Sequence, residues 1–177
     1  MNRNLYIRLH MVLAAVFLPF LLLMPLSGGL YLLGIKGSQT KTLAFQVAAQ
    51  VPETTGEQED FFRQLFSQQG IDFDFEYIRG SGPDFVFRPS SRDHFSARAQ
   101  EGQVSVYKLE PDLLASLMEI HKGHGPTHVK WLQRLFALGL LLITFSGVLL
   151  ASQIKAYRRL MFSGILIGFV VAGLAFL

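Results

Sequence analysis

The chain has 177 residues, of which 50% are hydrophobic and only 16% are charged, whereas about 25% of the residues in a typical soluble domain carry a charge. All 13 Asp and Glu lie between residues 36 and 130 with ten of the 16 Lys and Arg, so this segment has a net charge of −3 and the remainder has +6. This composition favours a membrane protein. The excess basic residues are divided between the two ends of the chain, which argues against nucleic acid as a partner, and the absence of cysteine excludes disulfides and thiol catalysis.

The first predicted element is an apolar helix over residues 11–33, which follows Arg3 and Arg8. Its 23 residues would form about 35 Å of helix, enough to cross the roughly 30 Å hydrocarbon core of a bilayer. The alternative is a cleaved signal peptide, whose apolar region is usually about 7–15 residues long and precedes a small-residue cleavage site. Neither feature is present, so residues 1–35 are predicted to form a retained transmembrane helix.

Two further apolar runs, at residues 135–151 and 160–177, follow Trp131. The short basic stretch between them, with Lys155, Arg158 and Arg159, predicts a tight helical hairpin over residues 127–177. The positive-inside rule places this basic turn and the N-terminus in the cytoplasm, and three crossings then put residues 36–130 outside it.

Residues 36–126 are predicted to form a small α+β domain inserted between the membrane helices. Apolar residues alternate over residues 43–51, which indicates a strand, although two interspersed alanines leave a helix possible. A capping box at residues 54–58, in either of two registers, precedes four apolar residues with helical spacing, and Gly70 is expected to end this helix.

The clearest strand pattern covers residues 71–77, where apolar residues alternate with three acidic ones. Further strands are expected at residues 84–88, 94–99 and 104–109, and Pro111 suits the first position of a final amphipathic helix. The resulting order of strand, helix, four strands and helix predicts an antiparallel sheet with helices on one face and a modest, phenylalanine-rich core.

Two groups of polar residues suggest chemistry but have simpler explanations. The acidic residues Asp72, Asp74 and Glu76 could hold calcium, yet strand alternation already explains them and the glycine and spacing of a calcium-binding loop are missing. Asp93 and His94 lie near two serines, but consecutive strand residues point in opposite directions and no nucleophile-elbow pattern is present. The sequence also lacks a phosphate-binding glycine loop, so we do not expect a stand-alone enzyme.

The strongest candidates for a ligand site are His121, His124 and His128, which lie beside the second apolar run. Their spacing would place them on one face of a continuous helix, but the glycines and proline at residues 123–126 predict a break. Imidazoles without thiolates suit a haem or a labile metal ion. The alternative is that these histidines, like His10 near the start of the first helix, are interfacial residues that meet lipid headgroups.

Several short motifs occur together in an order that resembles the PepSY-associated transmembrane family. They are Arg8-Leu9-His10, Pro25-Leu26-Ser27-Gly28-Gly29, Ile120-His121-Lys122-Gly123-His124-Gly125, Trp131, Thr144-Phe145-Ser146-Gly147-Val148-Leu149-Leu150 and Arg158-Arg159. The resemblance implies a multi-pass protein of the bacterial inner membrane, with a periplasmic PepSY-like domain at residues 36–126. Many such proteins are encoded for iron uptake, and some reduce ferric siderophores with electrons passed through haems that helix histidines hold.

By this resemblance, His10, His121 and His124 match the histidines of the family. Larger members have at least four membrane helices and more histidines, whereas this chain has three predicted helices, with His10 and the other three on opposite faces of the bilayer. We therefore expect a non-enzymatic protein whose periplasmic domain binds or modulates an envelope partner. The alternative is a haem- or metal-binding electron-transfer component of iron or copper handling, a membrane haem-dependent reductase component that acts as an oligomer or with a partner.

Overall fold

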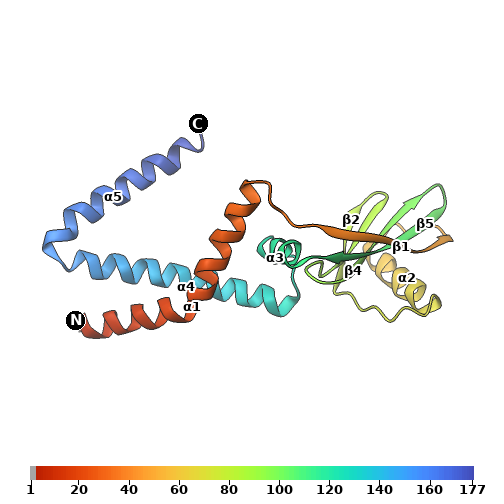
Figure 1. Cartoon of the computed structure of the whole chain (residues 1–177), viewed down its shortest axis with the longest axis horizontal. Coiled ribbons are helices and arrows are strands. Elements are labelled where there is room, and N and C mark those ends of the chain that lie inside the picture. The colour runs from red at the N-terminus through yellow and green to blue at the C-terminus, as the bar shows by residue number, and fades with distance from the viewer. Residues whose placement is uncertain (1–2) are drawn as a thin grey trace. The chain divides into compact units, whose positions relative to one another are not determined.

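The computed structural model describes residues 3–177, which form two compact units. The helical unit contains the chain up to Leu22 together with Arg134–Leu177, and the sheet unit contains Leu23–Gln133. The elements in chain order (Figure 1) are α1 (Arg3–Leu32), β1 (Gln39–Ala48), α2 (Thr55–Gln68), β2 (Tyr77–Ser81), β3 (Asp84–Arg88), β4 (His94–Gln100), β5 (Gln103–Pro111), α3 (Leu113–His121), α4 (Thr127–Ser152) and α5 (Lys155–Leu174).

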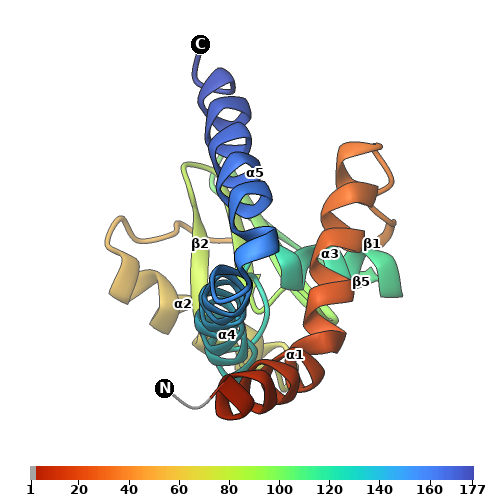
Figure 2. The same ribbon diagram turned by 90° about the vertical axis from the view of Figure 1, so that its left-hand side faces the viewer.

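Three helices, α1, α4 and α5, are long and apolar enough to cross a membrane, as their hydropathy predicts. In the helical unit α1 and α4 lie side by side (Figures 1 and 2) and meet through aromatic side chains. The rings of Phe20 and Phe136 stack with their centroids 5.4 Å apart, and those of Phe17 and Phe136 are 6.2 Å apart. Gly139 permits this approach, because a Cβ added there would overlap the Phe17 ring.

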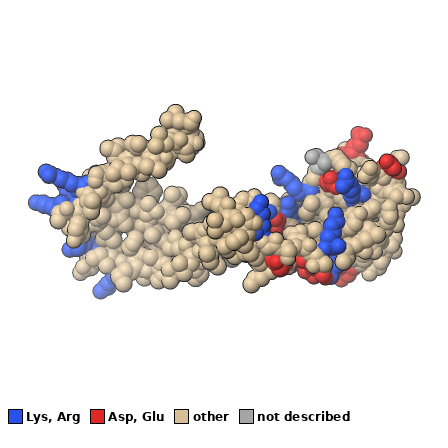
Figure 3. Space-filling model, turned by 45° about the horizontal axis from the view of Figure 1, so that its top comes forward, with Lys and Arg blue, Asp and Glu red and all other residues tan. Residues whose placement is uncertain are grey.

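The charged residues of the helical unit are all basic: Arg3, Arg8, Arg134, Lys155, Arg158 and Arg159. On the face shown in Figure 3, most of the length of this unit carries no charged side chain, and blue side chains gather at one end. The prediction of a basic turn is wrong in its boundaries, since Lys155, Arg158 and Arg159 belong to α5. Gln153 and Ile154 alone connect α4 to α5, and α5 diverges from α4 instead of packing along it as a tight hairpin would (Figure 1).

The sheet unit is built on a five-stranded antiparallel sheet with the strand order β1-β5-β4-β3-β2. The prediction of a strand near residues 43–51 is confirmed, because β1 pairs with β5 from Gln39–Pro111 to Ala48–Gln103, with a shift of register between Leu43 and Phe45. The strands predicted at residues 84–88, 94–99 and 104–109 are also confirmed as β3, β4 and β5.

One face of the sheet is covered by α2. Phe62, Leu65 and Phe66 are buried on a single side of this helix and pack on inward-facing residues of three strands: Phe85, Phe87, Phe95, Ala97, Val104 and Val106. The ring of Phe62 lies 5.2 Å from that of Phe85, and the ring of Phe66 lies 5.2 Å from that of Phe87. Burial of each large apolar side chain stabilises the fold by about 1.5–3 kcal/mol before the entropy cost is counted. The expected phenylalanine-rich core is therefore confirmed.

The strand predicted at residues 71–77 is wrong for most of its length, because β2 begins only at Tyr77. Residues 71–76 are extended without pairing in the sheet, apart from a hydrogen bond from Glu76 N to Arg88 O at 2.8 Å. Phe75 is buried in the core beside α2 while the acidic residues between the apolar ones are exposed. The alternation of apolar and acidic residues therefore indicates an extended chain with one buried side, and such a chain does not need to pair with another strand.

Pro111 does not start α3 as predicted. It is the last residue of β5, and the N-cap of α3 is Asp112, whose side chain accepts a hydrogen bond from Ala115 N at 2.7 Å. Asp112 also accepts hydrogen bonds of 2.8 Å from the backbone N and the hydroxyl of Ser38. Gly37 lies against this N-terminus with φ of +75°, and a Cβ there would overlap Ala115 N. The segment between α1 and β1 is therefore fixed on α3.

The expectation that both helices cover the same face is also wrong. Phe85 and Phe87 point toward α2, so Val86 and Arg88 of the same strand point to the opposite face. Glu119 of α3 contacts Arg88 on that opposite side. Sequence periodicity indicates which side of a helix is buried but not which face of a sheet it meets.

Candidate functional site

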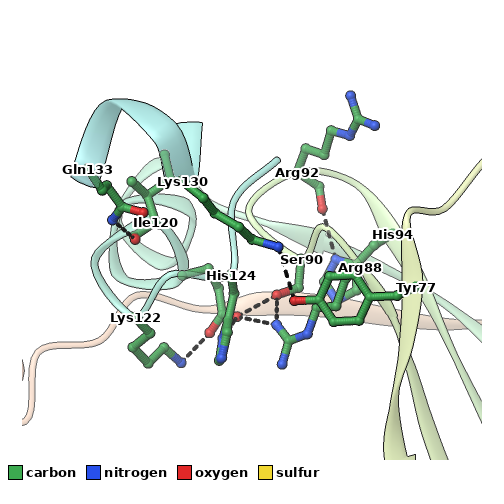
Figure 4. A network of polar contacts seen from close by, with 11 residues as sticks. Tyr77, Arg88, Ser90, Arg92, His94, Ile120, Lys122, His124, Lys130 and Gln133 are labelled. Carbon is green, nitrogen blue, oxygen red and sulfur yellow. Dashed lines mark hydrogen bonds and ion pairs between the residues drawn. The ribbon is translucent and has the colours of Figure 1, made fainter. Parts of the chain in front are cut away.

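The densest group of polar contacts in the sheet unit surrounds the carboxylate of Glu119, near the end of α3 (Figure 4). Its Oε2 accepts hydrogen bonds from Arg88 Nη1 at 2.9 Å, from the Ser90 hydroxyl and from His124 Nδ1 at 2.9 Å. Its Oε1 is paired with Lys122. Glu119 is only 9% exposed, so these donors replace the water that its charge loses on burial. We call these five residues the carboxylate network.

Two local features of the chain assemble this network. Arg88 is the last residue of β3. Ser90 lies in the loop that follows, and its backbone N donates a hydrogen bond to His124 O at 3.1 Å, which holds the loop against the segment after α3. After α3 the chain reverses at Gly123, where φ is +77°, a conformation that glycine adopts without strain. His124 N then donates to Glu119 O at 2.9 Å, which holds the imidazole beside the carboxylate.

The network keeps Glu119 ionised. Burial alone would raise the pKa of Glu119, but hydrogen bonds from Lys122, Ser90 and His124 lower it to about 2. Nearby, burial lowers the pKa of His94, against the opposing effect of its hydrogen bond from Nδ1 to Arg92 O. At neutral pH the network therefore holds a charged carboxylate, and His94 is neutral.

His121, in the last turn of α3, has its own partner. Its Nδ1 lies 2.8 Å from the hydroxyl of Ser27, which is fully buried and itself donates to Met24 O at 3.0 Å. Because that hydroxyl proton is directed to the carbonyl, the oxygen accepts from His121 Nδ1–H, and Nε2 keeps its lone pair. Gly28 makes room for the ring, since a Cβ there would lie 3.4 Å from His121 Cε1.

The same local arrangement recurs at His10 in the helical unit. His10 Nδ1 lies 2.8 Å from the hydroxyl of Ser146, which donates to Ile143 O at 2.9 Å. A Cβ on the adjacent Gly147 would lie 3.5 Å from His10 Cε1. In both places a Ser-Gly pair on an apolar helix fixes the Nδ1–H tautomer of a histidine, which leaves Nε2 as the nitrogen that can bind a ligand.

The candidate histidines are thus divided among different environments. The break predicted at residues 123–126 is confirmed, because α3 ends at His121 and α4 begins at Thr127. His121 is held by Ser27 and His124 by Glu119, while the side chain of His128 is exposed in the first turn of α4. Within residues 3–177, no group of three His, Cys, Asp or Glu side chains is arranged to hold a metal ion.

No family model matches this chain, and the comparisons with curated proteins and with solved structures gave no match. Function must therefore be inferred from the arrangement of its residues.

The acidic residues and the serine that the sequence analysis considered have separate partners in the structure. Asp74 pairs with Arg63 at 2.6 Å, whereas Glu76 accepts hydrogen bonds from the backbone N and hydroxyl of Thr127, so these carboxylates have separate partners. Ser90 donates to Glu119 and not to a histidine.

Sequence reasoning missed Arg88 and Glu119 and considered Ser90 only as a nucleophile near His94, although one signal for Glu119 was available. Glu119 interrupts the apolar pattern of α3 between the buried Met118 and the partly buried Ile120. A single carboxylate on the buried side of a helix requires a cationic or hydrogen-bonding partner. The identity of that partner, 31 residues earlier on β3, could not be read from the pattern.

Proposed function

We propose that this chain is a multi-pass protein of the bacterial inner membrane, related to the PepSY-associated family, whose periplasmic domain binds or modulates an envelope partner without catalysing a reaction. The observation that supports the proposal is the part of the sheet face opposite α2 that α3 does not cover, which we call the open face. A sheet in a small domain normally buries one face and can leave the other in water, where its side chains are available for binding.

The open face combines aromatic, apolar and charged side chains. Lys41 lies over the ring of Tyr107 at 4.0 Å from its centroid, and Leu43, which is paired with Tyr107, is 57% exposed. On neighbouring strands Arg98 pairs with Asp84 at 3.7 Å. Aromatic and arginine side chains are typical of protein-binding surfaces, since they supply large contact areas and directional hydrogen bonds. Here Tyr107 is half-buried and Arg98 is exposed.

Site-specific photocrosslinking in cells tests this function. A photoreactive residue at Leu43 or Tyr107 is expected to give an adduct of one discrete mass that contains an envelope protein. The matched control is Gln68, which is exposed on α2 and should not give that adduct. Adducts with lipid or with the chain itself alone, or the same adduct from Gln68, would contradict the proposal.

A second candidate function, haem or metal binding for electron transfer, is favoured by the two Ser-held histidines. His10 and His121 would be the ligands, because the Nε2 of each makes no hydrogen bond to any residue in the range 3–177. The donor set fits haem iron only in part, since each Ser-Gly pair holds one imidazole and a second axial ligand would come from another copy or a partner protein. A bound haem would supply one-electron chemistry.

An absorption spectrum of the detergent-purified chain separates the two functions. A Soret band that disappears in the His121→Ala or His10→Ala variant would support haem binding, with His128→Ala as the control. Colourless and metal-free protein, purified after growth in haem-replete and copper-fed medium, would exclude the second candidate and leave the first intact.

The proposed topology has its own test. With three crossings, the N-terminus and the α4–α5 connection lie in the cytoplasm and residues 36–130 lie in the periplasm. A reporter fused after Leu177 should then be active only as a periplasmic enzyme. A cytoplasmic signal from that fusion would contradict this arrangement of α1, α4 and α5.

A further inference from the structure

A hollow of about 270 Å³ lies on the open face of the sheet beside the carboxylate network. The residues that the argument uses are Val86, Arg88, His94, Ser96, Leu109 and Glu119, which all contribute to its lining. Its volume is far more than the roughly 30 Å³ that a single water occupies and lies just below the usual range of small-ligand pockets, about 300–1,000 Å³.

Arg88, which lines this hollow, has hydrogen-bond donors that no described residue uses. Its Nη1 donates to Ser90 and Glu119, but neither Nε nor Nη2 makes a hydrogen bond with any residue that the structure describes. Arg88 is only 8% exposed, and its Nε is a buried nitrogen without a partner. An unpaired buried N–H has lost its hydrogen bond to water without gaining another, so a native structure normally provides it with an acceptor.

The two unused nitrogens lie on the same side of the guanidinium group. Nε–H and one Nη2–H are parallel, and this fork matches the two oxygens of a carboxylate. Glu119 does not use the fork, because it approaches Nη1 only. The hydroxyl of Ser96, which also lines the hollow, likewise has no hydrogen bond to residues 3–177.

The charged residues of the lining, Arg88 and Glu119, balance each other, and Lys122 pairs with the same Glu119 carboxylate from outside the lining, so the three residues together carry one excess positive charge beside the hollow. The apolar side chains of Val86 and Leu109 complete the lining, which suits the short hydrocarbon part of an organic acid better than an inorganic anion.

We propose that this hollow binds a small carboxylate, which the Nε–Nη2 fork of Arg88 holds by two hydrogen bonds and the Ser96 hydroxyl by a third. The carboxylate belongs either to a free organic acid of a few carbon atoms or to the C-terminus of a peptide, since the chemistry of recognition is the same. This site goes beyond the proposed partner binding and does not depend on it.

Thermal unfolding of the detergent-purified chain provides the binding assay. Acetate represents the free acid and N-acetylalanine represents a peptide C-terminus, whereas acetamide, N-acetylalanine amide and chloride at equal ionic strength are the controls. A ligand that binds the folded state alone raises the midpoint as its concentration increases. We expect a saturable rise with one or both acids, and the more effective acid identifies the source. Equal rises with chloride or the amides would overturn the proposal.

Substitutions in the hollow test whether the acid binds there. Val86→Phe fills the hollow without removing a member of the carboxylate network, and Ser96→Ala removes one donor without adding volume. Arg88→Lys keeps the charge but lacks the fork. The matched control is Arg98→Lys, the same change on the same face but outside the hollow.

We expect Val86→Phe to raise the half-saturating acid concentration at least tenfold, with a smaller increase for Ser96→Ala and none for Arg98→Lys. If Arg88→Lys fails to fold, the comparison of Val86→Phe with Arg98→Lys still decides the question. Unchanged saturation in folded Val86→Phe protein would refute the site.

Discussion

Replacement of Glu119 by glutamine should destabilise the sheet unit strongly and change its response to acid. The substitution keeps the shape of the side chain but removes the charge that faces Arg88 and Lys122. It also introduces an amide NH₂ among groups that are themselves donors. The buried guanidinium of Arg88 would then lack its counter-charge, which costs about 3–5 kcal/mol in comparable buried pairs.

The pKa of Glu119 gives a second measure of the same effect. Its fall from 4.5 to about 2 corresponds to about 3 kcal/mol at neutral pH, at about 1.4 kcal/mol per pH unit. Because the pKa is lower in the folded state, this stability is fully present above pH 4.5 and is lost as the pH falls from about 4.5 to about 2. The wild-type chain should lose stability over this interval. The Glu119→Gln variant has no carboxylate to protonate at this position, so it should not show this acid-dependent loss.

Pulse proteolysis in urea, carried out on the detergent-solubilised chain, measures the stability of the sheet unit. With a denaturant slope of about 1–3 kcal/mol per M, a loss of about 3 kcal/mol lowers the urea midpoint by about 1–3 M. The control is Asp74→Asn, the same chemical change in an ion pair whose carboxylate is 89% exposed. Exposed pairs contribute only about 0–1 kcal/mol. A Glu119→Gln midpoint within error of the Asp74→Asn midpoint at pH 7 would refute this reasoning.

Three further predictions concern close contacts of two glycines and one serine. Gly37→Ala should cost about 2–3 kcal/mol in the urea assay because a methyl group would overlap α3, whereas Gly34→Ala, which has a similar positive φ and open space around it, should cost only about 1 kcal/mol. Ser27→Ala removes the hydroxyl that contacts His121, so the imidazole of His121 should no longer be held in its Nδ1–H tautomer. ¹⁵N NMR of the imidazole nitrogens detects this change, and an unchanged tautomer would contradict the hydrogen bond described. Gly139→Ala should weaken the contact between α1 and α4 and lower resistance to unfolding in SDS, while Gly164→Ala, where nothing lies within 4 Å, should have no effect.

Much of the candidate site depends on contacts between distant parts of the sequence. The glycines and proline at residues 123–126 predicted the break after α3 correctly, since their conformational preferences are local. The partners of the histidines were not predictable, because Ser27 and His121 are 94 residues apart and His10 and Ser146 are 136 residues apart. Nothing in the local pattern of either segment distinguishes a serine that holds a histidine from one that only bonds its own helix.

The amino-acid sequence by itself determined the three apolar helices, the buried side of α2 and most of the strands, because each follows from hydropathy and periodicity over a few neighbouring residues. The same local signal misled at residues 71–76, which alternate without pairing in the sheet. Only the tertiary structure decided that β1 pairs with β5 and that α3 meets the face opposite α2. It also brought Arg88 to Glu119, since a buried charge requires a partner but the pattern around it does not specify where in the chain that partner lies.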